Sequence, residues 1–167
     1  MALLDIGVVG AAGRMGQSLV REIVEKEGVR LVAASECNAH PALGQDAGSL
    51  AGVSTLGVTI TDDSAQVFEA ANSVLEFSAP QATVIHAGLA AAGGVGHVIG
   101  TTGLSVGEEG ALQAAARQTP IFWAPNMSIG VNVLVALAEQ AAAALNDDFD
   151  IETIFSTLNN GEWIEFE

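Results

Sequence analysis

The first residues with a clear chemical use are three glycines, Gly10, Gly13 and Gly16, which lie between a short apolar run and a long amphipathic segment. We expect a strand that ends at Gly10, a tight turn, and a helix that begins near Arg14. Main-chain N–H groups at the start of such a helix can hold the diphosphate of a dinucleotide. Gly10 and Gly13 would let the turn form and the phosphates approach, and Gly16 would let the helix pack closely on the strand.

An acid follows the second apolar run at the separation that such a site needs. Residues 29–34 form this run, and Ser35 and Glu36 end it. A carboxylate about twenty residues past the glycines accepts hydrogen bonds from a ribose diol. The glycine spacing is G-x-x-G-x-x-G rather than G-x-G-x-x-G, so a plain strand-to-helix turn is the alternative. The turn, the helix, the second strand and the acid together favour dinucleotide binding.

Composition and charge restrict the class of protein. The 167 residues suffice for one domain or slightly more, and half of them are apolar with few aromatics, which suits helices packed closely on a parallel sheet. A net charge of −15 disfavours a nucleic acid partner, because repulsion from phosphates would not be offset. One cysteine, Cys37, fits a reducing compartment, and no segment reads as a signal peptide or membrane span. We therefore expect a cytoplasmic protein, and we predict no metal ligands.

Strand and helix patterns alternate along the chain. We expect strands at residues 3–9, 29–35, 58–61, 73–77, 97–100 and 120–123, and helices at residues 15–27, 64–70, 81–92, 105–118 and 129–145. On the first helix, Leu19, Ile23 and Val24 form the predicted core stripe, Arg21 faces water and Gly28 is the C-cap. Residues 37–59 read as a long loop. The alternation predicts a doubly wound parallel α/β sheet of the Rossmann type.

Ligands bind such sheets at the carboxyl ends of the strands. Five loops are expected at that edge, at residues 10–15, 35–37, 77–80, 100–103 and 124–128, and all are rich in Gly, Ser, Thr, Pro or Asn. This clustering is the strongest indication of function that the residues give by themselves.

Four motifs occur in order along the chain: V-G-A-A-G-R-M-G at residues 9–16, F-S-A-P at 77–80, G-T-T-G at 100–103 and A-P-N-M-S-I-G-V-N at 124–132. Together they resemble the nucleotide-binding domain of bacterial dihydrodipicolinate reductase (4-hydroxy-tetrahydrodipicolinate reductase, of lysine and diaminopimelate biosynthesis). The resemblance covers about residues 4–151 and implies an NAD(P)H-dependent oxidoreductase. The cofactor-binding residues that it implies are Gly10, Ala11, Ala12, Gly13, Arg14 and Met15 at the diphosphate, Glu36 at the adenosine ribose, and Gly100, Thr101, Thr102, Ala124, Pro125, Asn126 and Met127 at the nicotinamide.

Cys37 departs from the family pattern. Members that accept NADPH tend to carry Arg directly after the acid, where it pairs with the 2′-phosphate. Here that position is Cys37, and the overall charge is negative. We therefore expect NADH to be preferred, with NADPH as a second ligand. The alternative interpretation of Cys37 is a small loop residue with no role in binding.

The end of the chain departs further. In the family, a strand like residues 148–152 leads into a substrate domain with a His-His pair, a Lys and a Gly-Thr, none of which has a counterpart here. His40, His86 and His97 are scattered, and we expect them to be structural or exposed, so no catalytic residue is predicted. Residues 153–167 read instead as a β-hairpin with its turn at Asn159-Asn160-Gly161, whose first arm continues a strand of the main sheet. The predicted domains are residues 1–152, binding NAD(P), and residues 153–167, the hairpin tail.

Three hypotheses follow. The first is a truncated or engineered nucleotide-binding domain that binds a nicotinamide dinucleotide but does not complete hydride transfer by itself, with a natural stand-alone domain as its variant. The second is a small complete enzyme whose homodimer partner supplies the missing groups. The third is a natural or engineered Rossmann scaffold whose hairpin is a surface for dimerisation or for binding a partner.

Overall fold

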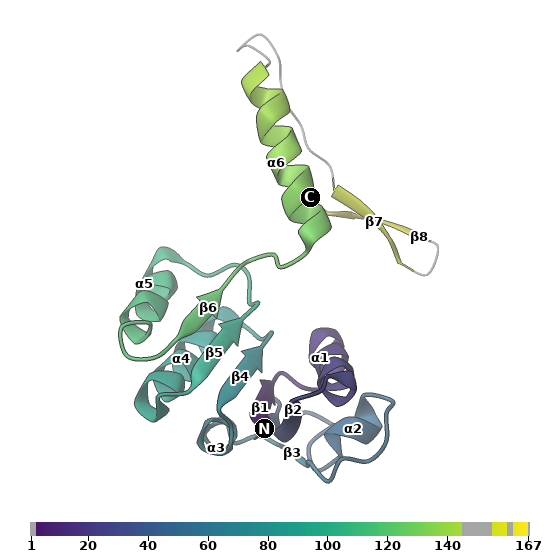
Figure 1. The fold of residues 1–167 in the computed structure, drawn as a ribbon, viewed down its shortest axis with the longest axis vertical. Helices are drawn as coiled ribbons and strands as arrows, with labels where there is room; N and C mark the ends of the chain where they lie inside the picture. The colour runs from purple at the N-terminus through teal and green to yellow at the C-terminus, as the bar shows by residue number, and fades with distance from the viewer. Residues whose placement is uncertain (1–2, 145–154, 160–161, 167) are drawn as a thin grey trace. The chain divides into compact units, whose positions relative to one another are not determined.

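The computed structural model describes residues 3–144, 155–159 and 162–166. Its contacts divide the chain into two units, Met1–Pro125 and Asn126–Glu167, which are described separately (Figure 1). The predicted boundary between residues 152 and 153 lies outside the described residues and stays a prediction.

The first unit is built on a six-stranded parallel sheet with the strand order β3-β2-β1-β4-β5-β6. The strands are β1 (Leu4–Val9), β2 (Val29–Ser35), β3 (Ile60–Thr61), β4 (Ser73–Glu76), β5 (Gly96–Ile99) and β6 (Ile121–Trp123). The chain moves outward from β1 in one direction to β2 and β3, and in the other to β4, β5 and β6. The order therefore reverses between β1 and β4, which is where open α/β sheets bind ligands.

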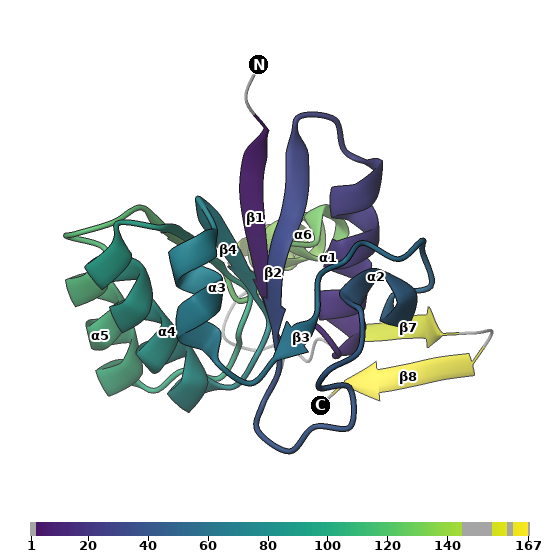
Figure 2. The ribbon, with the colours of Figure 1, turned by 90° about the horizontal axis from the view of Figure 1, so that it is seen from below.

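Helices cover both faces of this sheet, as the predicted doubly wound fold requires. They are α1 (Arg14–Glu25), α2 (Ala47–Leu50), α3 (Ser64–Ala70), α4 (Pro80–Gly93) and α5 (Val106–Ala115). In Figure 2, α3, α4 and α5 form a row on one side, with α1 and α2 on the other. The core follows the alternation of β1: Ile6 and Val8 belong to the cluster with α1, whereas Val9 packs with α3.

Helix α1 buries a narrow stripe. Its buried residues are Gly16, Val20 and Ile23, and Leu19 packs against the same core. The prediction for Val24 was wrong: its side chain is 42% exposed, because it lies beyond the edge of the stripe set by residues 16, 20 and 23. Arg21 was predicted to face water but is half-buried, and its guanidinium donates to the carbonyl of Ala51.

The ends of helices follow local capping chemistry. Lys26, not Gly28, caps α1, and Gly28 adopts a positive φ of 85° in the turn that leads into β2. Ser105 and Glu108 form a reciprocal capping box at the start of α5. Gly94, with φ of 65°, ends α4 in the left-handed conformation.

The predicted long loop at residues 37–59 is ordered by one carboxylate. Asp46 accepts main-chain N–H bonds from Ser49, Leu56, Gly57 and Val58, and the segment includes the short helix α2. The hydrogen bond from Ser49, assisted by those from Leu56 and Gly57, lowers the pKa of the Asp46 carboxyl. Hydrogen bonds to the Asp46 side chain therefore hold the middle of this loop in one conformation.

The second unit contains α6 (Ile129–Ala144) and two strands, β7 (Phe155–Asn159) and β8 (Glu162–Phe166). The two strands pair antiparallel, with Phe155 opposite Phe166, in a sheet of their own. The first arm was predicted to continue a strand of the main sheet as well as to pair with the second arm. β7 is not among the strands of the six-stranded sheet, so that part of the prediction was wrong. Residues 160–161, at the predicted turn, lie outside the described residues, and oligomerisation through this segment stays a prediction. Among the helices that the structure describes, none is both long and apolar enough to cross a membrane.

The contact between α1 and β1 predicts an asymmetric response to two alanine substitutions. A Cβ at Gly16 would fall 2.7 Å from the Ala11 Cα and still nearer the Gly10 carbonyl oxygen, both of them main-chain atoms. Gly16→Ala should lower the free energy of unfolding in urea by about 2 kcal/mol or more. Gly110→Ala in α5 is the control, because a Cβ there meets nothing within 4 Å, and it should raise stability by about 0.5–1 kcal/mol. Equal effects at the two positions would contradict the close packing of α1 on β1.

Candidate functional site

The glycine turn joins the carboxyl ends of β1 and β2. The N–H groups of Gly10 and Ala11 both donate to the Ser35 carbonyl at 3.0 Å. Gly10 adopts a φ of 75°, and a Cβ there would lie 2.7 Å from the Phe77 carbonyl oxygen. Gly13 is the N-cap of α1 and offers no side-chain cap. The N–H groups of the first turn of α1 are therefore left for an anion.

Glu36 lies next to this turn. One carboxylate oxygen accepts the Ala12 N–H at 3.0 Å and the other accepts the Cys37 N–H at 2.9 Å. The side chain is half-buried. Because each carboxylate oxygen can accept more than one hydrogen bond, Glu36 can hold the turn and still accept from a ligand hydroxyl.

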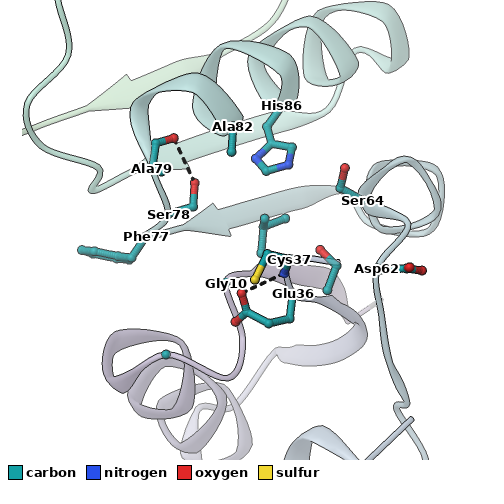
Figure 3. Close-up of a pocket in the computed structure, with 13 residues that line it drawn as sticks. Gly10, Glu36, Cys37, Asp62, Ser64, Phe77, Ser78, Ala79, Ala82 and His86 are labelled. Carbon is teal, nitrogen blue, oxygen red and sulfur yellow. Dashed lines mark hydrogen bonds between the residues drawn. The ribbon is translucent and has the colours of Figure 1, made fainter. Parts of the chain in front are cut away.

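A cavity of about 390 Å³ opens between the glycine turn and the loop after β4 (Figure 3). Its lining residues are Val9, Gly10, Gly13, Ser35, Glu36, Cys37, Asp62, Ser64, Phe77, Ser78, Ala79, Ala82 and His86. Of the residues predicted to bind the cofactor, Gly10, Gly13 and Glu36 meet here. Glu36 and Asp62 give the lining a negative character, and no Lys or Arg is among the lining residues.

Three lining residues, Asp62, Ser64 and His86, were missed as site residues. Asp62 and Ser64 read in sequence as the start of a helix, and His86 as a structural residue of another helix. The sequence carries no signal for them, because α3 and α4 reach this cavity only through the packing of the sheet.

The other predicted residues follow β5 and β6. The Gly100 N–H donates to the Glu76 carbonyl at 2.8 Å, and a Cβ at Gly100 would overlap the Phe77 ring. Thr101 is buried, and its carbonyl accepts the Trp123 indole N–H at 3.0 Å. Thr102 is exposed. These loops lie at the carboxyl edge but outside the lining of the cavity.

Ala124 and Pro125 end the first unit, whereas Asn126 and Met127 open the second. The Asn126 side chain accepts the Ser128 N–H at 2.8 Å, and the Asn126 carbonyl accepts from Asn132. The contact of Asn126 and Met127 with a nicotinamide stays a prediction, since the two units are described separately.

A buried acid stands at the end of β4. Glu76 is fully buried, and its carboxylate accepts from His86 Nδ1 at 2.8 Å and from His97 Nε2 at 2.7 Å. The hydroxyls of Ser78 and Thr83 also donate to it. Both histidines are buried. His40 is half-buried, and its Nδ1 accepts the Ala42 N–H.

Two opposing effects set the charge of Glu76. Burial by itself would raise the pKa of this carboxyl, but hydrogen bonds from His86 and His97, attraction to His86 and the Ser78 hydroxyl lower the pKa to about 2. Glu76 is therefore an ionised carboxylate at neutral pH. Such a buried charge persists only where its oxygens are fully hydrogen-bonded.

The comparisons with known proteins agree with this architecture. The family model described as "Dihydrodipicolinate reductase, N-terminus" matches residues 4–127. The 4-hydroxy-tetrahydrodipicolinate reductase of Brucella abortus (strain 2308) is 52% identical over 152 residues, which cover 90% of this chain and 57% of that protein. The chain thus spans little more than half the length of the curated relatives it matches.

Solved structures share the fold. A dipicolinate-bound dihydrodipicolinate reductase from Paenisporosarcina sp. TG-14 has a TM-score of 0.67 at 23% identity, over 84% of this chain and 54% of that one. RSP in complex with beta-NADH has a TM-score of 0.54 at 15% identity, over 86% of this chain and 63% of that one.

The fold and the glycine turn define an α/β domain of the Rossmann class, with the features of a dinucleotide site at its switch point. The family match covers most of the chain. The chain belongs to the dihydrodipicolinate reductase family and corresponds to its N-terminal part.

The charge of Glu76 predicts an acid-sensitive fold. Its pKa in the folded chain, about 2, lies below the ordinary value of 4.5, so the carboxylate adds stability that is complete above pH 4.5 and is lost as the pH falls toward 2. This difference corresponds to about 3 kcal/mol. When the pH is lowered from 4.5 to about 2, the free energy of unfolding in urea should fall in both proteins, and the fall should be about 3 kcal/mol larger in the wild type than in Glu76→Gln. Glu69→Gln, at an exposed acid of α3, should keep the wild-type slope, and equal slopes in all three proteins would contradict the assignment.

Proposed function

We propose that this chain is the nicotinamide-dinucleotide-binding domain of a 4-hydroxy-tetrahydrodipicolinate reductase of diaminopimelate and lysine biosynthesis. The observation that carries the proposal is the meeting of the glycine turn and Glu36 at one cavity, at the carboxyl ends of β1 and β2. The names of its relatives support the reaction, and the beta-NADH complex of RSP supports the compatibility of such a fold with the ligand. A cytoplasmic location is part of the same proposal.

The residues fit a dinucleotide in a definite order along the sheet. The diphosphate would lie at the uncapped first turn of α1, where Gly10 and Gly13 leave the main chain open. Glu36 would accept the hydroxyls of the adenosine ribose at the end of the cavity that Glu36 and Asp62 line, and the cavity reaches from there to Ser78 in the loop after β4. With adenosine at β2 and the diphosphate at β1, the rest of the ligand must extend over β4, β5 and β6.

The role of this chain is binding and orientation. When bound, NADH supplies the hydride that the proposed reaction transfers. The loops after β5 and β6, which contain Gly100–Thr102 and Ala124–Met127, would hold the nicotinamide end. Reduction of 4-hydroxy-tetrahydrodipicolinate remains a proposal for the whole protein, because the chain spans 57% of its relative.

The charge of the cavity favours NADH over NADPH. A 2′-phosphate on the adenosine ribose would approach Glu36 and Asp62, with no Lys or Arg among the lining residues to offset the repulsion. Cys37 is exposed at the position after the acid and cannot pair with a phosphate.

Isothermal titration calorimetry with NADH and NADPH tests this preference. NADH should bind on the order of tenfold more tightly, because a 2′-phosphate meets two carboxylates. Glu36→Gln should weaken NADH binding about tenfold through loss of the charged acceptor. Glu25→Gln, at an exposed acid of α1, makes the same charge change and should leave both affinities unaltered. If neither NADH nor NADPH binds at high micromolar concentration, the proposal is refuted.

Cys37→Arg tests the preference for NADH over NADPH by adding a cation beside the ribose. A guanidinium at this position can form charge-assisted hydrogen bonds with a 2′-phosphate. The variant should therefore tighten NADPH binding at least tenfold and change NADH binding little. Cys37→Lys would supply a charge without the planar fork and should gain less. No gain for NADPH in either variant would place the 2′-position away from residue 37.

A further inference from the structure

The cluster formed by Glu76, His86 and His97 has no role in the proposed contacts with the cofactor, although it lies directly beneath the loops that would make them. Glu76 ends β4, His86 comes from α4, and His97 comes from β5. His86 is also part of the cavity lining, with its ring placed between α4 and the cavity (Figure 3). The cluster therefore lies next to the site on the β4 side of the switch point.

Hydrogen bonds run from Glu76 to two separate loops. The Ser78 hydroxyl, in the loop after β4, donates to the Glu76 carboxylate. Thr83 Oγ1 lies 3.0 Å from that carboxylate and 2.9 Å from Thr101 Oγ1, which belongs to the loop after β5. The Ser78 N–H donates to Thr101 Oγ1 at 3.2 Å. Glu76 thus closes a ring of bonds that includes both loops.

The direction of these bonds follows from the charge of Glu76. An ionised carboxylate only accepts, so the single hydroxyl proton of Thr83 is directed to Glu76. Thr83 Oγ1 then accepts from the Thr101 hydroxyl, and Thr101 Oγ1 accepts from the Ser78 N–H. With this direction, the hydroxyl protons of Ser78, Thr83 and Thr101 all point towards the carboxylate.

The same condition fixes both histidines. His86 Nδ1 and His97 Nε2 must carry protons, because each faces an acceptor. His97 Nδ1 is buried without a hydrogen-bond partner, so a proton there would be an unsatisfied buried donor. The Nε2–H tautomer of His97 is therefore the one that matches its buried surroundings. Phe68 packs on both rings, with centroids 5.9 Å from His86 and 5.3 Å from His97.

We propose that Glu76 is a positioning residue of the cofactor site, and that it holds the loops containing Ser78 and Thr101 together as one wall under the nicotinamide half of the ligand. This inference rests on the proposed binding of NADH. The sheet order supports it, since adenosine at β2 and the diphosphate at β1 leave β4 and β5 to the other half. Glu36 and the glycine turn, which would hold the AMP half, are bonded to β2 and to each other instead.

Two variants remove this support to different extents. Thr83→Val keeps the size of the side chain and deletes the hydroxyl between Glu76 and Thr101. Glu76→Gln replaces the acceptor with an amide whose NH₂ group cannot accept from a histidine N–H. When the amide oxygen takes the position that accepts from Ser78, Thr83 and His86, the NH₂ group faces His97 Nε2. The His97 proton must then move to Nδ1, where it finds no partner. The matched control is Thr119→Val, which deletes the 2.7 Å bond from a buried threonine to the Val95 carbonyl at the amino end of the sheet.

Binding of NADH and of AMP should separate positioning from general loss of stability. Thr83→Val should weaken NADH binding about threefold and leave AMP binding unchanged, and Glu76→Gln should weaken NADH binding about tenfold. Thr119→Val should lower Tm and change neither affinity. Unchanged NADH binding in both site variants, or equal losses for NADH and AMP in Thr83→Val, would overturn the proposal.

Amide hydrogen exchange of the ligand-free proteins gives an independent readout. In both site variants, exchange at Ser78 and Thr101 should quicken while Ala11 and Ala12 in the glycine turn stay as in the wild type. A long-range ¹H–¹⁵N spectrum should show the Nε2–H tautomer of His97 in the wild type and its loss in Glu76→Gln. If exchange at Ser78 and Thr101 is unchanged in both site variants, the positioning role of Glu76 is overturned, whether or not the wild type binds NADH. If exchange quickens in the variants but the wild type does not bind NADH, only the proposed function is refuted.

Discussion

The structure depends first on the close contact of two main-chain segments, the end of β1 and the first turn of α1. No side chain fits between Gly16 and the carbonyl of Gly10, so the helix can approach the strand only where glycine stands. Through the same turn, Gly10 and Ala11 bond to the Ser35 carbonyl, which ties the end of β2 to β1. The side of the cavity at Gly10 and Gly13 is therefore formed by main chain.

The opposite wall of the site is built on a different principle. There, a buried carboxylate collects hydrogen bonds from β5, α4 and the loop after β4. Main-chain packing at β1 needs no ionisable group, whereas the Glu76 cluster works only while Glu76 is charged and both histidines donate to it. The two sides of the site should therefore respond differently to acid. The glycine turn should open only when the whole domain unfolds, whereas the Glu76 cluster should break when Glu76 is protonated.

Charge links the site to the composition of the chain. With 20 acidic residues against 5 Lys and Arg, most positions near a ligand are neutral or negative. A dinucleotide diphosphate can still bind, because the N–H groups of a helix terminus supply the positive potential locally. In our proposal, a second phosphate on the ribose would instead approach the carboxylates of Glu36 and Asp62. The shortage of Lys and Arg that disfavours nucleic acids therefore also favours NADH over NADPH in our proposal.

The sequence by itself determined the doubly wound fold, the glycine turn and the pairing of that turn with Glu36, because these depend on local periodicity and on spacing along one β-α-β unit. It could not reveal the Glu76 cluster. Glu76, His86 and His97 lie on three elements, and only the register of β4 with β5, which sets Val74 opposite His97, brings them to one face of the sheet. The exposure of Val24 and the half-burial of Arg21 were likewise decided by tertiary packing, since each depends on a partner segment that local pattern does not specify.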